Sequence, residues 1–176
     1  MNLPTQYQWL ENEGAPKMLV EFLKTYGVTE VQGQGDNPVI LGWAKEVGLE
    51  KEYLHDLTPW CGLEMAVIAQ RAGKEVPKQP LWALNWANFG IKADIPMLGD
   101  ILVFKRTGGG HVGMYIGQDA TAYHVAGGNE SDKSNIVRIA KDRLYAARRP
   151  IYTTGQPSNV RVVNLESNGQ ISTDEK

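Results

Sequence analysis

The spacing of apolar residues changes once along this chain, near residue 100, and the change limits the folds that the chain can adopt. Up to Gly90 the apolar residues recur every three to four positions, which is typical of amphipathic helices. From Ile101 onward they gather in short runs rich in β-branched and aromatic residues, namely ILVFK, HVGMYIG, TAYHVA, NIVRIA and LYAAR. Helices followed by strands predict an α+β fold with an antiparallel sheet, rather than a doubly wound parallel sheet.

The first half of the chain contains four candidate helices, and a glycine follows each of them directly. Glycine is favoured there because it adopts a positive φ without a steric penalty. The helical spacing and these stop signals place the expected helices at 16–26, 38–47, 59–72 and 81–89, the last being short and rich in tryptophan.

Composition excludes several classes of protein. A single cysteine in 176 residues excludes an intramolecular disulfide, and a net charge of −2 with dispersed basic residues argues against a nucleic-acid partner. No apolar run reaches the roughly 18 residues of a membrane span, and the N-terminus lacks the pattern of a signal peptide. We therefore expect cytoplasmic synthesis without membrane insertion, one domain over 1–152, and a polar, flexible C-terminal extension over 153–176.

Cys61 lies at the expected first turn of the helix at 59–72, after Thr58 as a candidate N-cap and Pro59 at the first helical position. A thiol there faces unpaired backbone N–H groups and the positive end of the helix dipole, which lowers its pKa from about 8.5 toward roughly 3.5–7.5. A lone cysteine on an apolar helix is nevertheless more often a small buried hydrophobe. A histidine within reach of the thiol has to decide between the two interpretations.

His111 is the candidate base, because it begins a strand directly after three glycines that leave the backbone around it open. The next strand ends shortly before Asn129, and antiparallel pairing brings that end back toward the start of the His111 strand. Asn129 is therefore expected to accept a hydrogen bond from the His111 ring. His124, in the middle of the same strand, is the alternative orienting residue or else a packed strand histidine.

These residues stand in motifs that resemble a known family. TPWCGLEM, IPMLGDILVF, GGGHVGMYIG and YHVAGGNESD, with EVQGQGDNPVI and AARRP, resemble the NlpC-like and CHAP cysteine peptidoglycan hydrolases. The resemblance covers about residues 8–151. Within the family, the motifs resemble more specifically a compact subgroup found in phage and prophage genomes. It implies a papain-like fold, with Cys61 as nucleophile, His111 as base and Asn129 as the polar third member.

Two positions depart from the pattern of the family. Glu64 stands where an apolar or aromatic residue is usual, and Glu130 stands where the subgroup often has glutamine. A carboxylate within a turn of Cys61 stabilises either the neutral thiol or the His111 cation, depending on which is nearer. We expect these residues to affect the pH optimum rather than the reaction class.

The resemblance implies hydrolysis of an amide bond in peptidoglycan through a thioester, by an N-acetylmuramoyl-L-alanine amidase or a stem-peptide endopeptidase. Trp60, beside the nucleophile, is the candidate for lining the substrate groove. No cofactor is expected, and no metal, since the histidines lack local ligand spacing.

The biological setting implied is that of a monomeric phage or prophage endolysin that causes bacteriolysis after release through a holin or delivery with a virion. A secreted antibacterial effector is a variant of this expectation. An acyl transferase using the same thioester, and a catalytically silent wall-binding or virion structural module, are the two alternatives.

Overall fold

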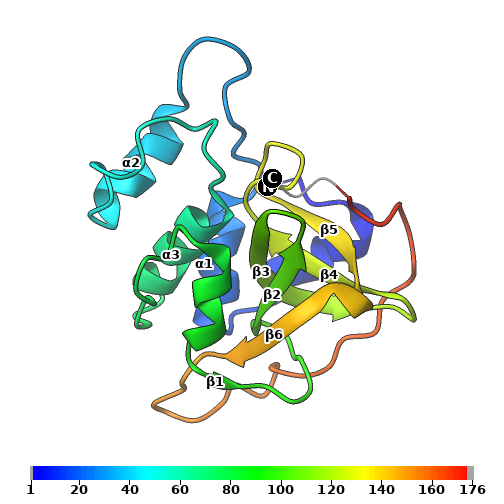
Figure 1. The fold of residues 1–176 in the computed structure, drawn as a ribbon. Coiled ribbons are helices and arrows are strands. Elements are labelled where there is room, and N and C mark those ends of the chain that lie inside the picture. Colours follow the sequence, from blue (N-terminus) through cyan, green and yellow to red (C-terminus); the bar gives the residue numbers. More distant parts are fainter. Residues whose placement is uncertain (1, 174–176) are drawn as a thin grey trace.

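The computed structural model describes residues 2–173 and has an α+β architecture. Helices from the first half of the chain pack against a sheet built from the second half (Figure 1). Within the described residues the sheet has six strands in the order β1-β6-β2-β3-β4-β5, and all neighbours are antiparallel. The predicted order of helices and antiparallel strands is therefore confirmed.

The described helices begin with a 3₁₀ segment that the apolar spacing did not predict. They are η1 (Thr5–Asn12), α1 (Lys17–Thr25), α2 (Pro38–Glu46), α3 (Cys61–Arg71), the 3₁₀ segment η2 (Ala83–Asn88) and η3 (Lys141–Arg143). The Asn37 side chain caps α2 by accepting a hydrogen bond from the Val39 N–H, and proline occupies its first position. No helix among the described residues is long and apolar enough to cross a lipid bilayer.

The helix α3 begins two residues later than the sequence predicts. The Thr58 carbonyl accepts a hydrogen bond from the Tyr53 hydroxyl at 2.9 Å, and the Thr58 N–H donates to the His55 carbonyl at 3.1 Å. These bonds hold residues 55–59 in a turn outside the helix. Cys61 is consequently the first residue of α3 and Trp60 its N-cap.

The strands follow the predicted runs, with β1 as a two-residue addition. They are β1 (Ile91–Lys92), β2 (Ile101–Arg106), β3 (Gly109–Gln118), β4 (Ala122–Gly127), β5 (Asn135–Ala140) and β6 (Leu144–Arg149). Alternate residues of β3 join different apolar clusters: Val112, Met114 and Ile116 lie in the one that includes α1 and α3, and Tyr115 lies in another.

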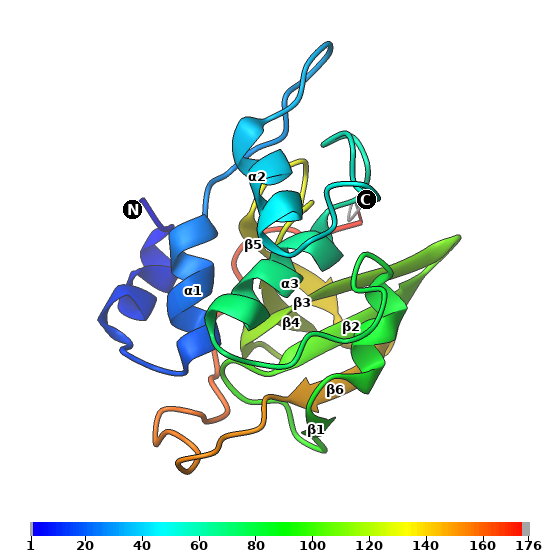
Figure 2. The ribbon, with the colours of Figure 1, turned by 90° about the vertical axis from the view of Figure 1, so that its left-hand side faces the viewer.

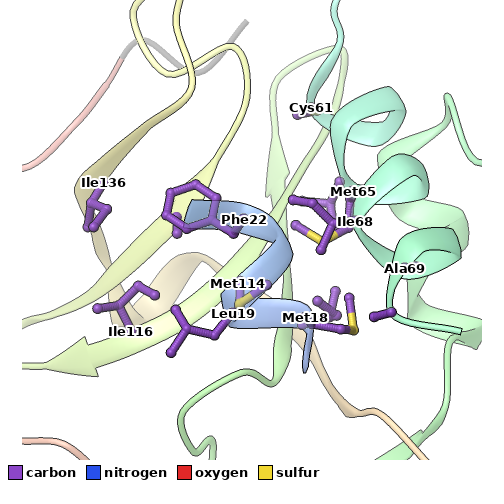
Figure 3. Packing of buried hydrophobic residues seen from close by; sticks show 14 of the residues in the cluster. Met18, Leu19, Phe22, Cys61, Met65, Ile68, Ala69, Met114, Ile116 and Ile136 are labelled. Carbon is purple, nitrogen blue, oxygen red and sulfur yellow. The ribbon is translucent and has the colours of Figure 1, made fainter. Parts of the chain in front are cut away.

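The main core lies between the sheet and the two helices α1 and α3, which occupy the same side of the sheet (Figure 2). Met18 and Phe22 of α1, Met65 and Ile68 of α3, and Met114 of β3 meet there (Figure 3). Cys61 belongs to the same cluster and lies where α3 begins. Packing of α3 on the sheet thus fixes the position of the thiol relative to β3.

The described part of the C-terminal extension packs against the sheet instead of projecting from it. Asn164 and Ile171 form parallel bridges with Gln118 and Arg138. Leu165 fills the space beside Gly117, where an added Cβ would lie 2.5 Å from the Leu165 Cδ1. The few apolar residues of this polar segment therefore pack against the domain, and its low apolar content does not indicate these contacts.

Candidate active site

Cys61 is presented by the start of α3, where backbone N–H groups are not used by the helix. The first hydrogen bond of the helix runs from the Glu64 N–H to the Trp60 carbonyl at 2.9 Å, and the indole of Trp60 offers no capping oxygen. Gly62 lies so close to the Pro80 carbonyl that a Cβ there has no space. Glycine at this position lets the segment at 80–81 pass directly against the first turn of α3.

His111 lies opposite Phe104 in the β2–β3 pairing and is completely buried. The neighbouring Gly110 lies against Leu84, since an added Cβ would be 2.6 Å from the Leu84 Cδ2. The Nε2 of His111 is 2.6 Å from the Oε1 of Glu130, which is also buried. With Nε2 engaged by the carboxylate, Nδ1 is the ring nitrogen that can exchange a proton with Cys61.

The thiol and the imidazole shift each other's pKa. Burial by itself raises the pKa of Cys61, but the contact with His111, its positive charge and the Val112 N–H hold that pKa below its ordinary value. Burial by itself lowers the pKa of His111, whereas Glu130 and Cys61 together raise it to about 10. Both shifts favour the thiolate–imidazolium pair over the neutral pair, and the thiolate is the form in which a cysteine acts as a nucleophile.

Glu130 contacts the His111 ring at Nε2, and it is a second candidate, beside Asn129, for the third member of the site. The chain between β4 and β5 passes through left-handed residues at Asn129, Ser131 and Asp132, with φ of 61°, 55° and 63°. This conformation directs the Glu130 side chain to His111, whereas regular strand geometry led to Asn129. Asn129 lies beside it, with 2% of its surface exposed, and its orienting role stays a prediction.

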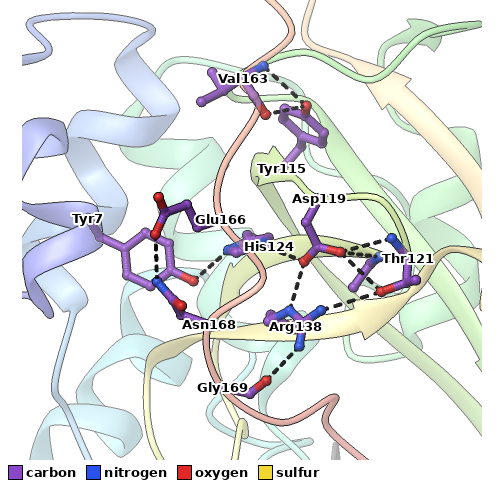
Figure 4. A network of polar contacts seen from close by, with 11 residues as sticks. Tyr7, Tyr115, Asp119, Thr121, His124, Arg138, Val163, Glu166, Asn168 and Gly169 are labelled. Atoms are coloured by element: carbon purple, nitrogen blue, oxygen red, sulfur yellow. Dashed lines mark hydrogen bonds and ion pairs between the residues drawn. The ribbon is translucent and has the colours of Figure 1, made fainter.

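His124 lies in a separate polar network (Figure 4). Its Nδ1 is 2.7 Å from the Tyr7 hydroxyl and its Nε2 is 3.0 Å from the Asp119 Oδ2. Asp119 also accepts a hydrogen bond from the Arg138 Nε at 2.8 Å, and Arg138 donates to the Gly169 carbonyl. Both ring nitrogens are therefore engaged away from His111, and the structure does not bring this alternative orienting residue to the site.

The tryptophans differ from expectation in which of them reaches the surface. Trp60 is completely buried against Trp43, with ring centroids 6.0 Å apart, so its ring is not presented to a ligand. Trp82, by contrast, is 71% exposed. It follows the 80–81 segment that contacts Gly62, so Trp82 is the aromatic residue that could meet a substrate near Cys61.

Two other features bear on ligand binding. Among the described residues no group of three or more His, Cys, Asp and Glu side chains is placed to hold a metal ion. A groove of about 1090 Å³ lies near the C-terminal end of α3, lined by residues that include Lys17, Ala72, Lys74 and Tyr152. Cys61 and His111 do not line this groove, so the described groove and the thiol are separate features.

In comparisons with known protein families and with curated proteins, nothing matches this chain. The function is therefore argued from the geometry of the site and from the sequence motifs.

Proposed function

We propose that this chain is a cysteine peptidoglycan hydrolase with a papain-like fold of the NlpC-like and CHAP kind. The observation that carries the proposal is the interaction of Cys61, at the start of α3, with His111, whose Nε2 is 2.6 Å from the Oε1 of Glu130. Nucleophile, base and orienting group come from three separate parts of the chain, which favours selection for chemistry over chance packing. The choice of peptidoglycan as the substrate rests on the sequence motifs around Cys61 and His111.

The proposed reaction begins with attack of the Cys61 thiolate on the carbonyl carbon of the substrate amide. The Cys61 N–H donates a hydrogen bond to the oxyanion, since the helix does not use it. His111 gives its proton to the leaving amine, and a thioester remains on Cys61. The neutral His111 then takes a proton from water, the hydroxide attacks the thioester, and the carboxylic acid product leaves as the thiolate is restored.

Glu130 has two roles in this scheme. Its contact with Nε2 holds that side of the ring and leaves Nδ1 to exchange a proton with the sulfur. Its negative charge stabilises the imidazolium that accompanies the thiolate. The same charge raises the pKa of Cys61, so the carboxylate supports the base at some cost to the nucleophile.

Under this proposal the substrate bond is the one between muramic acid and L-alanine or one within the peptide stem. The setting is a monomeric phage or prophage endolysin, made in the cytoplasm and delivered to the wall through a holin or with a virion. Acyl transfer from the same thioester would need an amine acceptor in place of water. A catalytically silent wall-binding module is the second candidate, and it is favoured by the burial of Cys61, which is only 3% exposed.

Digestion of purified sacculi separates these functions. The protein is incubated with sacculi, and mass spectrometry identifies the new termini among the soluble products. Cleavage by wild type and its loss in Cys61→Ala support the hydrolase, and the position of the new amine identifies the bond. Products that carry an added amine indicate transfer, whereas sedimentation with sacculi without any cleavage indicates the silent module.

A further inference from the structure

Glu64 is a second buried carboxylate next to the proposed catalytic residues, and the mechanism above does not use it. It lies in the first turn of α3, three residues after Cys61, and no part of its surface is exposed. Burying a carboxylate is costly unless its surroundings compensate for the lost water. The position is therefore expected to have a reason other than core packing.

Glu64 contacts both ends of the segment at 128–134, which carries Glu130 near its middle. At the far end, the Ser134 hydroxyl donates a hydrogen bond to the Glu64 Oε1 at 2.6 Å. At the near end, the Glu64 Oε2 and the Trp60 ring lie against Gly128, where an added Cβ would be 2.6 Å from that oxygen. The position of Glu130 is thus tied to α3 through Glu64.

The same segment is fastened on its other side by the chain at 27–30. The Ser134 N–H donates to the Val28 carbonyl at 2.7 Å, the Gly27 N–H donates to the Ser134 carbonyl at 2.9 Å, and the Glu30 N–H donates to the Asp132 carbonyl at 2.9 Å. These backbone bonds hold the far half of the segment. The contacts at Gly128 and Ser134 connect it to the helix that carries the nucleophile.

We propose that Glu64 is a positioning residue that clamps the 128–134 segment to α3 and so keeps Glu130 at the His111 ring. Ionisation of Glu64 keeps the Ser134 hydroxyl as a donor and places a further negative charge beside the thiolate and the His111 ring. The proposal rests on the proposed function, because it assumes that Cys61 and His111 are the reacting pair.

The surroundings of Glu64 move its ionisation up into the neutral pH range. Burial raises the pKa of Glu64 to about 7, against the lowering effects of the Ser134 and Thr25 hydroxyls. Glu130, on the clamped segment, raises this pKa further, and His111, on β3, lowers it. Cys61 is the titratable group on the same helix, and its thiolate is a third charge that faces this region.

The test follows the ring nitrogens of His111 by NMR in protein labelled with ¹⁵N-histidine, between pH 5 and pH 11, with His111→Gln to assign the signals. In wild type we expect a step with a midpoint near pH 7, as Glu64 ionises, before the ring loses its own proton near pH 10. Glu64→Gln imitates the protonated carboxyl, so it should lack the first step and keep the wild-type signals of low pH. The exposed Glu52→Gln is the matched control and should keep the step.

Removing the clamp should release Glu130 from His111. In Glu64→Ala, and in Ser134→Ala if the first variant folds poorly, we expect His111 to lose its proton at least about one pH unit lower than in wild type. A step near pH 7 that persists in Glu64→Gln would overturn the proposal. If His111 titrates in both alanine variants with the same midpoint as in wild type, the proposal is overturned as well.

The outcome is separable from that of the proposed function, because the NMR titration needs no substrate. If the titrations follow the expected course and no variant cleaves sacculi, the substrate assignment fails and the positioning role stands. If wild type cleaves sacculi and the titrations do not differ between variants, only the role of Glu64 fails.

Discussion

Two buried histidines of this protein each lie beside a carboxylate, yet their rings end in opposite chemical states. His124 contacts the Tyr7 hydroxyl through Nδ1 at 2.7 Å and Asp119 through Nε2 at 3.0 Å. Burial lowers the pKa of His124, and the effect of Asp119 in the other direction does not overcome it. His111 is equally buried, but its contact with Glu130 engages only Nε2, and its pKa is raised to about 10.

The difference lies in what shares the carboxylate. Arg138 donates to Asp119 at 2.8 Å, so the charge of this carboxylate is already compensated before His124 adds to it. Glu130 instead faces His111, and the ring of His111 also interacts with the Cys61 thiol. A histidine with both nitrogens satisfied by fixed partners stabilises a fold, whereas one with a nitrogen left for an ionisable neighbour can move a proton.

The largest expected effect separates the two histidines by activity. His111→Ala should lower the rate of sacculus cleavage by about 10⁴-fold or more, because both proton transfers are lost. His124→Ala, measured on the folded fraction, should stay within about tenfold of wild type, because its partners do not reach the thiol. Rates of product release by mass spectrometry decide between them, and a larger loss in His124→Ala would reverse the comparison.

The next effect separates the two networks by stability. Asp119→Ala removes the acceptor of a largely buried ion pair and leaves Arg138 without its counter-charge, so we expect a loss of about 3–5 kcal/mol in unfolding free energy. Urea denaturation measures this loss, and Asp142→Ala, at an exposed position, serves as the control. Equal stability of the two variants would show that the His124 network contributes little to the fold.

The two regions should also respond to pH with opposite sign. The folded protein holds the Glu64 proton more tightly than the unfolded chain. The contribution of this proton to the unfolding free energy is therefore present at low pH and is lost as pH rises from about 4.5 through about 7. Glu64→Gln should therefore gain up to about 3 kcal/mol over wild type at pH 8.5, with little difference or a reversal at pH 4.5. Urea denaturation at both pH values measures the difference.

The stability contribution of Asp119 should have the opposite dependence on pH. Arg138 is the main cause that holds the pKa of Asp119 well below its usual range, so this contribution is present above about pH 4 and is lost as pH falls. The difference in unfolding free energy between wild type and Asp119→Ala should consequently be smaller in strong acid than at neutral pH. A deficit that stays constant from pH 7 to pH 2 would contradict the assigned electrostatic role of Asp119.

A smaller effect is expected at the third position of the site. Glu130→Gln keeps the shape of the side chain but removes the charge that supports the imidazolium, so we expect a loss of about 10–10³-fold in kcat, below that of losing the base. Asn129→Ala, at the residue that the sequence predicts as the orienting group, should be the milder variant. Kinetics in which Asn129→Ala is more damaging than Glu130→Gln would restore the sequence-based assignment.

The sequence was sufficient for features that depend on local pattern. The spacing of apolar residues predicts α3 and β3, and Cys61 and His111 are expected where each of these elements begins. The α+β class follows from the order of the two patterns. These predictions depend on period, capping and turn residues, which act over a few positions and do not require knowledge of the packing.

The features that the sequence did not reveal depend on distant contacts. Glu130 reaches His111 where the β4–β5 connection passes through left-handed residues, a local conformation that regular strand geometry does not predict. The burial of Trp60 and the exposure of Trp82 depend on how the segments at 28–49 and 80–84 pack around α3. Neither the loop conformation nor this packing leaves a periodic signal in the sequence.

The smallest expected effect concerns Trp82, which is 71% exposed. An indole beside the segment that contacts Gly62 is placed to stack on a sugar or a peptide, and an aromatic contact of this kind is worth about 0.5–1.5 kcal/mol. Trp82→Ala should therefore raise KM by about two- to tenfold and leave kcat and stability unchanged, while Trp82→Phe keeps most of the affinity. Ile95→Ala, at another exposed apolar residue, is the control for a general surface effect. An unchanged KM in Trp82→Ala would place the substrate elsewhere around the thiol, and an equal change in Ile95→Ala would show that the effect is not specific to the site.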